Sequence, residues 1–156
     1  MIDLPESEKL RYLRKALTRG TVFWFKSSLL DDGEHTVKEK FAVVVCSEVE
    51  NDEILFVYAT SRVEKYQSTP FVSETVPLPV GSYPFFKKET LLNVRDLKAI
   101  PLVALAKLLP GAFEVKGSLS AEDVKRLDKT IMAARSIVWQ QKVRCLPKKD
   151  PPPPKP

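Results

Sequence analysis

The chain has 156 residues, of which 44% are hydrophobic and 29% are charged, and a formal net charge of +5, a composition typical of one globular domain. No run approaches the roughly 18 apolar residues that span a bilayer, and two cysteines and one histidine are too few for a disulfide framework or a metal site. The sequence therefore predicts a protein of the reducing cytoplasm, without a membrane segment or a metal site, whose positive charge suits an anionic partner.

The spacing of apolar residues predicts a helix, a series of short strands and a second, longer helix. Ser7 is placed to cap the first helix, and Ser120 is followed by acidic residues at the start of the last one. In chain order we expect a helix at 7–18, strands at 22–25, 41–47, 54–59, 74–78 and 90–93, an edge strand and a helical turn within 95–110, and a helix from 120 to about 140.

These elements predict a mainly β fold with flanking helices, an α+β class in which small curled sheets and partly closed barrels are common. The main domain is expected at 20–141, with an N-terminal helical extension at 1–19 and a disordered tail rich in lysine and proline at 142–156. Proline-rich segments can bind aromatic-lined grooves, so the tail is either such a ligand or an inert end.

A cation begins one predicted strand, and hydroxyl groups end the next. Lys40 precedes the second strand, while Thr60, Ser61 and Arg62 follow the third. If these strands pair antiparallel, their two ends meet at one edge of the sheet. A positive charge beside hydroxyl groups there could hold a phosphodiester.

Several short motifs follow one another in the order and spacing of a known family. They are Gly20-Thr21-Val22-Phe23-Trp24, a long polar loop, Lys40-Phe41-Ala42-Val43-Val44-Val45, Ala59-Thr60-Ser61, Gly81, and Thr90-Leu91-Leu92-Asn93-Val94-Arg95. Over roughly residues 20–138 this pattern resembles the MazF/PemK family of toxins. The resemblance implies a small curled SH3-like β-barrel, usually a homodimer, that cuts single-stranded RNA without a metal or cofactor and leaves a 2′,3′-cyclic phosphate. It also implies an acidic antitoxin as a partner, which agrees with the positive charge of this chain.

The chain departs from the family pattern at three places. The family's catalytic arginine falls at Lys40, and the proline that follows it falls at Phe41. An acidic residue that some members carry late in the barrel falls at Asn93, and the N-terminal helix lies outside the usual family core. Lysine keeps the charge of arginine but lacks the planar fork that binds a phosphate through two hydrogen bonds.

The resemblance and the residue chemistry together suggest roles. Lys40 would supply charge to the phosphate, and Thr60, which matches the family's threonine, would hydrogen-bond a phosphate oxygen. His35, the single histidine, lies in the loop before Lys40 and titrates near neutrality, so it is a candidate base, with Glu34 and Glu39 as alternatives. Contacts to RNA are expected from Ser61, Arg62, Asn93 and Phe86.

Each candidate also has an ordinary structural explanation. Lys40 can be a solvated lysine at a strand start, Thr60 a common strand-end residue, and His35 part of an exposed loop. Of Phe85 and Phe86, one is expected in the core because adjacent strand residues point to opposite faces. The sequence therefore leaves two hypotheses, an endoribonuclease toxin and a non-catalytic protein of the same fold that binds nucleic acid or a protein partner.

Overall fold

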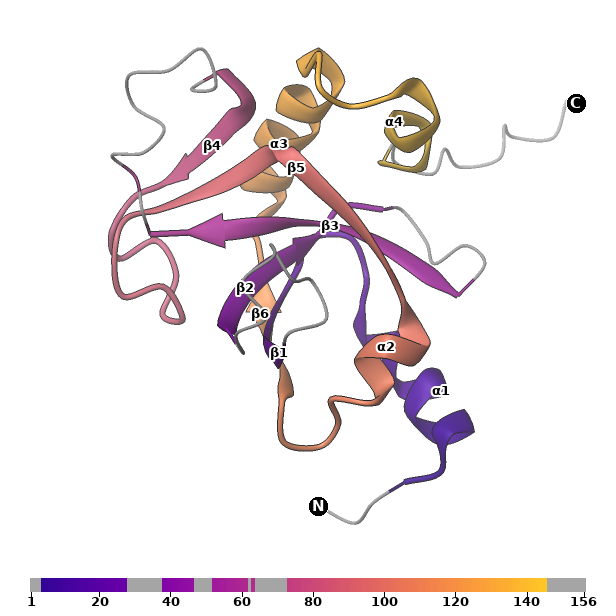
Figure 1. Ribbon diagram of the computed structural model, residues 1–156. Coiled ribbons are helices and arrows are strands. Elements are labelled where there is room, and N and C mark those ends of the chain that lie inside the picture. The colour runs from indigo at the N-terminus through magenta and orange to yellow at the C-terminus, as the bar shows by residue number, and fades with distance from the viewer. Residues whose placement is uncertain (1–3, 28–37, 47–51, 62, 64–72, 146–156) are drawn as a thin grey trace, which may run out of the picture.

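A six-stranded antiparallel sheet organises the chain (Figure 1). The computed structural model describes residues 4–27, 38–46, 52–61, 63 and 73–145. Its elements in chain order are α1 (Glu6–Ala16), β1 (Thr21–Ser27), β2 (Lys38–Val44), β3 (Glu53–Thr60), β4 (Thr75–Leu78), β5 (Thr90–Pro101), α2 (Leu102–Ala106), β6 (Phe113–Ser118), α3 (Ala121–Ala133) and α4 (Trp139–Cys145).

The strands lie in the order β4-β5-β3-β2-β1-β6, and every neighbouring pair is antiparallel. The predicted α+β class with a β-rich centre is therefore confirmed. Within the described residues β4 and β6 remain the two edges and do not pair with each other, so the curled sheet is not closed into a barrel. The long strand β5 bends where its register against β3 shifts, between the pairs Phe56–Lys98 and Tyr58–Asn93.

Side chains of alternate residues divide the core between the two faces of the sheet. Phe23 and Phe25 of β1 and Phe56 of β3 lie on one face, where their ring centroids are 5.7–6.3 Å apart across the strands. We call this the aromatic face. Phe41 of β2 points to the opposite face, where its ring meets the ring of Phe86 at 5.5 Å. Helix α3 contacts β4 and β5 and buries Leu127 and Ile131. Both side chains belong to the hydrophobic core.

The N-terminal helix is part of the same core. Leu13 and Leu17 are 0% and 2% exposed, and α1 packs beside α2 at one end of the sheet (Figure 1). Arg14 at the end of α1 donates to Oδ1 of Asp52 at 2.7 and 3.0 Å. The expected cap by Ser7 is wrong, because the helix begins one residue earlier and its N-cap position is Pro5 without a side-chain hydrogen bond.

The C-terminal helix differs most from expectation, because it is two helices. Ser120 caps α3 as predicted and accepts a hydrogen bond from the amide of Asp123 at 3.2 Å. The helix then stops at Ala134, whose backbone is extended, and α4 begins at Trp139. Strand β6 was not predicted at all, and α2 takes the place of the expected helical turn. No helix in the described ranges has the length and apolar character needed to cross a membrane.

Candidate functional site

The register of β2 and β3 brings the predicted phosphate-binding groups to one face. Phe41 lies opposite Ala59 in this antiparallel pair. Lys40 comes just before Phe41 and Thr60 just after Ala59, so both lie at the same end of the pair. Since side chains alternate between faces, Lys40 and Thr60 both point to the aromatic face. The expected antiparallel pairing of these two strands is therefore confirmed.

Tyr58 joins these residues, and the sequence analysis did not single it out. It lies opposite Ala42 on the aromatic face, and the Lys40 Nζ is 5.4 Å from the centre of its ring. Both side chains are half-buried. Alternation was the signal available in the sequence, because Tyr58 precedes Thr60 by two residues and must share its face.

Two buried polar residues extend the same face across β5 and β4. Asn93 of β5 lies opposite Tyr58, and Thr75 of β4 lies opposite Asn93. Their exposed fractions are 5% and 9%. Burying a polar side chain costs free energy unless it is hydrogen-bonded. A row of buried polar side chains on one face is therefore a candidate for a functional site. We call Lys40, Tyr58, Thr60, Thr75 and Asn93 the polar cluster.

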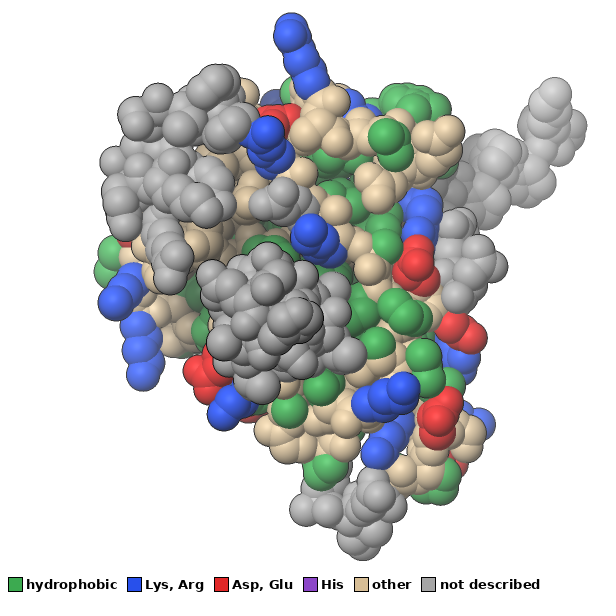
Figure 2. All heavy atoms as spheres, in the orientation of Figure 1, with side chains coloured by type: hydrophobic (Ala, Val, Ile, Leu, Met, Phe, Trp, Pro, Cys, Tyr) green, Lys and Arg blue, Asp and Glu red, His purple; other side chains and the backbone are tan. Residues whose placement is uncertain are grey.

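The polar cluster combines one cation with hydroxyl and amide groups. Among the residues that the structure describes, no carboxylate forms an ion pair with Lys40. Elsewhere on the surface seen in Figure 2, Lys and Arg side chains are spread out rather than gathered in one patch. A cation with neutral hydrogen-bond donors is suited to an anionic oxygen.

The other predicted site residues have different positions. Ser61 directly follows β3 and is exposed. Phe86 is not brought to the polar cluster, because the residue is 8% exposed and its ring packs edge-on against Phe41 on the opposite face. It is thus the core member of the Phe85–Phe86 pair, as expected for one of the two. His35 and Arg62 lie outside the described residues.

The polar cluster offers no carboxylate, histidine or thiolate to a metal ion. Over the described ranges, no group of three or more His, Cys, Asp or Glu side chains is placed to hold one. The polar groups of the cluster are the ammonium of Lys40, the phenol of Tyr58, the hydroxyls of Thr60 and Thr75 and the amide of Asn93. The candidate bases Glu34 and His35 lie in the undescribed segment, and Glu39 is exposed one residue before Lys40.

Comparisons with known proteins concern the fold. No protein-family model matches the chain, and no curated protein does. The structure is similar to a chain in the crystal structure of MazE–MazF from Deinococcus radiodurans, with a TM-score of 0.51 and 11% sequence identity, over 74% of this chain and 92% of that chain. At that identity the likeness concerns the fold alone. The chain therefore has a MazF-like fold, a mostly antiparallel sheet with flanking helices.

Proposed function

We propose that this protein is the toxin of a toxin–antitoxin system and that it cuts single-stranded RNA without a metal ion. The observation that carries the proposal is the placement of Lys40 and Thr60 on one face at the same end of β2 and β3. The MazF-like fold supports it, since the similar structure is a MazE–MazF complex. By the same likeness we propose an acidic antitoxin as partner, a homodimer as the assembly and the cytoplasm as the location.

The proposed reaction uses the RNA's own 2′-hydroxyl as the nucleophile. Its oxygen attacks the adjacent phosphorus and loses its proton to a base, the bond from phosphorus to the 5′-oxygen breaks, and that oxygen takes up a proton. The products are a 2′,3′-cyclic phosphate and a 5′-hydroxyl. Negative charge grows on the phosphoryl oxygens in the transition state, so a fixed cation and hydrogen-bond donors lower the barrier.

Three residues of the polar cluster have a role in this scheme. The ammonium of Lys40 faces the phosphoryl oxygens, and the hydroxyl of Thr60 donates a hydrogen bond to one of them. The amide of Asn93 lies deeper, opposite Tyr58, and helps to shape the floor of the site. His35 is the proposed base because an imidazole accepts a proton at neutral pH. Ser61 and Arg62 would contact the flanking nucleotides.

Cleavage of an unstructured RNA in the presence of EDTA tests the proposal. The wild-type protein should cut it, and Lys40→Ala and Thr60→Ala should each slow cleavage by about 10²- to 10³-fold, the usual effect of removing one group that stabilises the transition state. Lys26→Ala is the matched control, since Lys26 is an exposed lysine of the neighbouring strand β1 that points to the opposite face. Mass spectrometry of the 3′ ends should show the cyclic phosphate.

A second function is favoured by the composition of the site. Lysine replaces the arginine of the resembling family, and Asn93 cannot transfer a proton as an acid would. A non-catalytic protein with this fold would bind RNA or a protein partner through the same face. In that case the wild-type protein binds the RNA and leaves it intact, while Lys40→Ala weakens the binding.

A further inference from the structure

Lys40 falls where the resembling family has its catalytic arginine. The lysine side chain is a flexible stem with a point charge, whereas the guanidinium of arginine is a planar fork that fixes its own geometry on a phosphate. Among the described residues the Lys40 ammonium has no acceptor of a hydrogen bond and no ion-pair partner. It lies over the ring of Tyr58, with Nζ 5.4 Å from the ring centre.

The ring of Tyr58 is itself firmly positioned. It lies nearly parallel to the ring of Phe25, with centroids 6.5 Å apart, and edge-on to Phe56 at 5.5 Å. Phe25 and Phe56 are 1% and 0% exposed, so two core side chains fix the phenol. Because the face of an aromatic ring is negative, an ammonium within about 6 Å of the centroid is attracted to it.

We propose that Tyr58 is a positioning residue that holds the Lys40 ammonium at the phosphate position and so replaces the directionality of the missing guanidinium fork. The consequence for cleavage rests on the proposed function, but the contact between the ring and the ammonium does not. The ring face performs this task, and the phenolic hydroxyl is not needed for it. Tyr58 therefore acts through Lys40 and need not touch the reacting atoms.

Two substitutions separate the ring from its hydroxyl group. Tyr58→Phe keeps the aromatic face and should cleave RNA within about twofold of the wild type, whereas Tyr58→Leu should be about 3- to 30-fold slower, the range of one cation–π contact. In the Lys40→Ala background Tyr58→Leu should have no further effect, because the group that it positions is gone. If Tyr58 only stabilised the fold, Tyr58→Leu would slow cleavage by the same factor with Lys40 present and in the Lys40→Ala background. Tyr58→Phe would then restore the rate equally in both backgrounds.

A spectroscopic measurement tests the contact without any RNA. In a protein with ¹³C-labelled lysine, the Hε signals of Lys40, identified by their absence in Lys40→Gln, should be shifted upfield by the ring. The shift should persist in Tyr58→Phe and disappear in Tyr58→Leu. If the wild type leaves RNA intact, the proposed function fails, and affinity for a 2′-O-methyl RNA replaces cleavage as the readout. Equal activity or affinity of Tyr58→Leu and wild type, or an unshifted Lys40 signal, overturns the positioning role.

Discussion

The hydroxyl group of Tyr83 donates a hydrogen bond to Oδ2 of Asp123 at 2.5 Å and so joins the β4–β5 connection to the first turn of α3. The same phenol oxygen accepts a hydrogen bond from the amide of Ser120 at 2.9 Å. The ring of Tyr83 stacks on Phe85, with centroids 5.3 Å apart, and Phe85 contacts Phe86, which covers Phe41. One phenol thus connects a helix N-terminus to the core on the face away from the polar cluster.

Replacing Tyr83 by phenylalanine should destabilise the fold by about 1–3 kcal/mol, because the carboxylate of Asp123 and the amide of Ser120 each lose a hydrogen bond. Urea unfolding measures the change. Tyr12→Phe is the matched control, since that phenol is 46% exposed and its loss should have little effect. Equal values for the two variants would mean that the network does not stabilise the protein.

Two glycines with nearly the same backbone angle allow the cost of backbone strain to be distinguished from the cost of side-chain crowding. Gly20 and Gly81 have φ of +87° and +84°, a region in which an L-residue costs about 1–2 kcal/mol. A Cβ on Gly20 would lie 2.9 Å from Cγ2 of Val124, whereas one on Gly81 would meet nothing within 4 Å.

Gly81→Ala should therefore cost only the strain, about 1–2 kcal/mol, and Gly20→Ala the strain and the crowding against α3, about 2–4 kcal/mol in all. Chemical unfolding of both variants measures the difference. Adding Val124→Ala should recover much of the extra loss in Gly20→Ala, because it removes the methyl group that the new Cβ meets. No recovery in the double variant would contradict the crowding.

The carboxylate of Glu74 fixes the segment between α3 and α4. Its Oε1 accepts hydrogen bonds from the amide and the hydroxyl of Ser136, at 3.2 and 2.9 Å. Partial burial acts to raise the pKa of Glu74, but these bonds, a backbone bond from Arg135 and the charge of Arg95 outweigh it, so the pKa is lowered. The folded state therefore binds this proton less readily than the unfolded chain.

A carboxylate with a lowered folded-state pKa stabilises the protein above its unfolded pKa, and this contribution is lost as the pH falls through the folded value. Glu74→Gln should thus be less stable than wild type at pH 7, by less than about 1 kcal/mol because solvent screens the site. The gap should narrow toward pH 3. Denaturant unfolding across this range measures it, and a gap independent of pH would show that the charge of Glu74 is irrelevant.

This contact also explains what sequence periodicity could not predict. Ala134 and Val138 continue the apolar spacing of α3, so the pattern predicts one helix to about residue 140, whereas a tertiary contact to Glu74 ends it earlier. Strand β6 had a usable signal, since Phe113 and Val115 alternate with exposed residues. Pairing of the central strands was predictable because their apolar runs are strong and a short connection joins them.

The candidate site was predictable to a similar degree. The position of Lys40 and Thr60 at the same end of their strand pair follows from antiparallel pairing alone. Thr75 and the depth of Asn93 could not be predicted, because the position of β4 beside β5 and the register of both depend on the whole sheet. The sequence also could not predict which face of the sheet Phe86 packs on, because that depends on its contact with Phe41.

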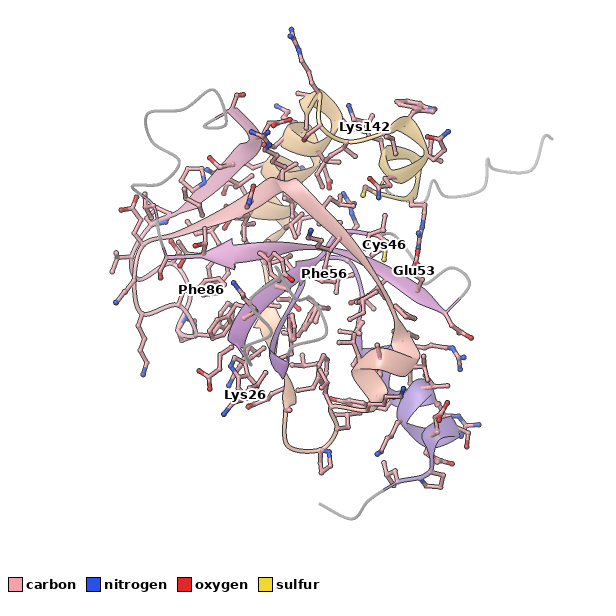
Figure 3. The ribbon with its side chains drawn as sticks, in the orientation of Figure 1. Lys26, Cys46, Glu53, Phe56, Phe86 and Lys142 are labelled. Atoms are coloured by element: carbon pink, nitrogen blue, oxygen red, sulfur yellow. The ribbon has the colours of Figure 1, made fainter. Side chains whose placement is uncertain are left out.

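Arg144 of α4 binds Glu53 of β3, and we expect this contact to limit the access of reagents to the thiol of Cys145. Arg144 donates to Oε1 of Glu53 at 2.9 Å and to its carbonyl oxygen at 3.1 Å, and in Figure 3 Glu53 and Cys46 lie below α4. Cys145, the last residue of α4, is 3% exposed. Burial, with a smaller effect of Cys46, raises the pKa of the Cys145 thiol to about 12.

In a Cys46→Ser background, Cys145 should therefore react slowly with iodoacetamide at pH 8, because both the thiolate and the exposed state are rare. Arg144→Gln should speed the reaction about tenfold by favouring local opening of α4. Gln140→Ala, a change at an exposed position of α4, should leave the rate unchanged. A rate that follows global stability instead of the Arg144 contact would contradict local opening.

The cations of Lys40 and Lys26 allow a local phosphate site to be distinguished from diffuse attraction by the net charge of +5. They lie on neighbouring strands and opposite faces. If Lys40 contacts a phosphate, Lys40→Gln should lower the slope of log Kd against log salt concentration by about 0.7, the value for one contact on a single strand.

Lys26→Gln removes the same charge and should leave that slope nearly unchanged. Fluorescence anisotropy with a labelled 2′-O-methyl oligonucleotide gives both slopes without cleavage of the probe. Diffuse attraction depends on total charge and barely on position, so it requires the two variants to change equally. Equal slopes for the two variants would therefore show that Lys40 does not contact a phosphate, whatever the cleavage assay shows. A lower slope in Lys40→Gln alone would place the phosphate on the aromatic face.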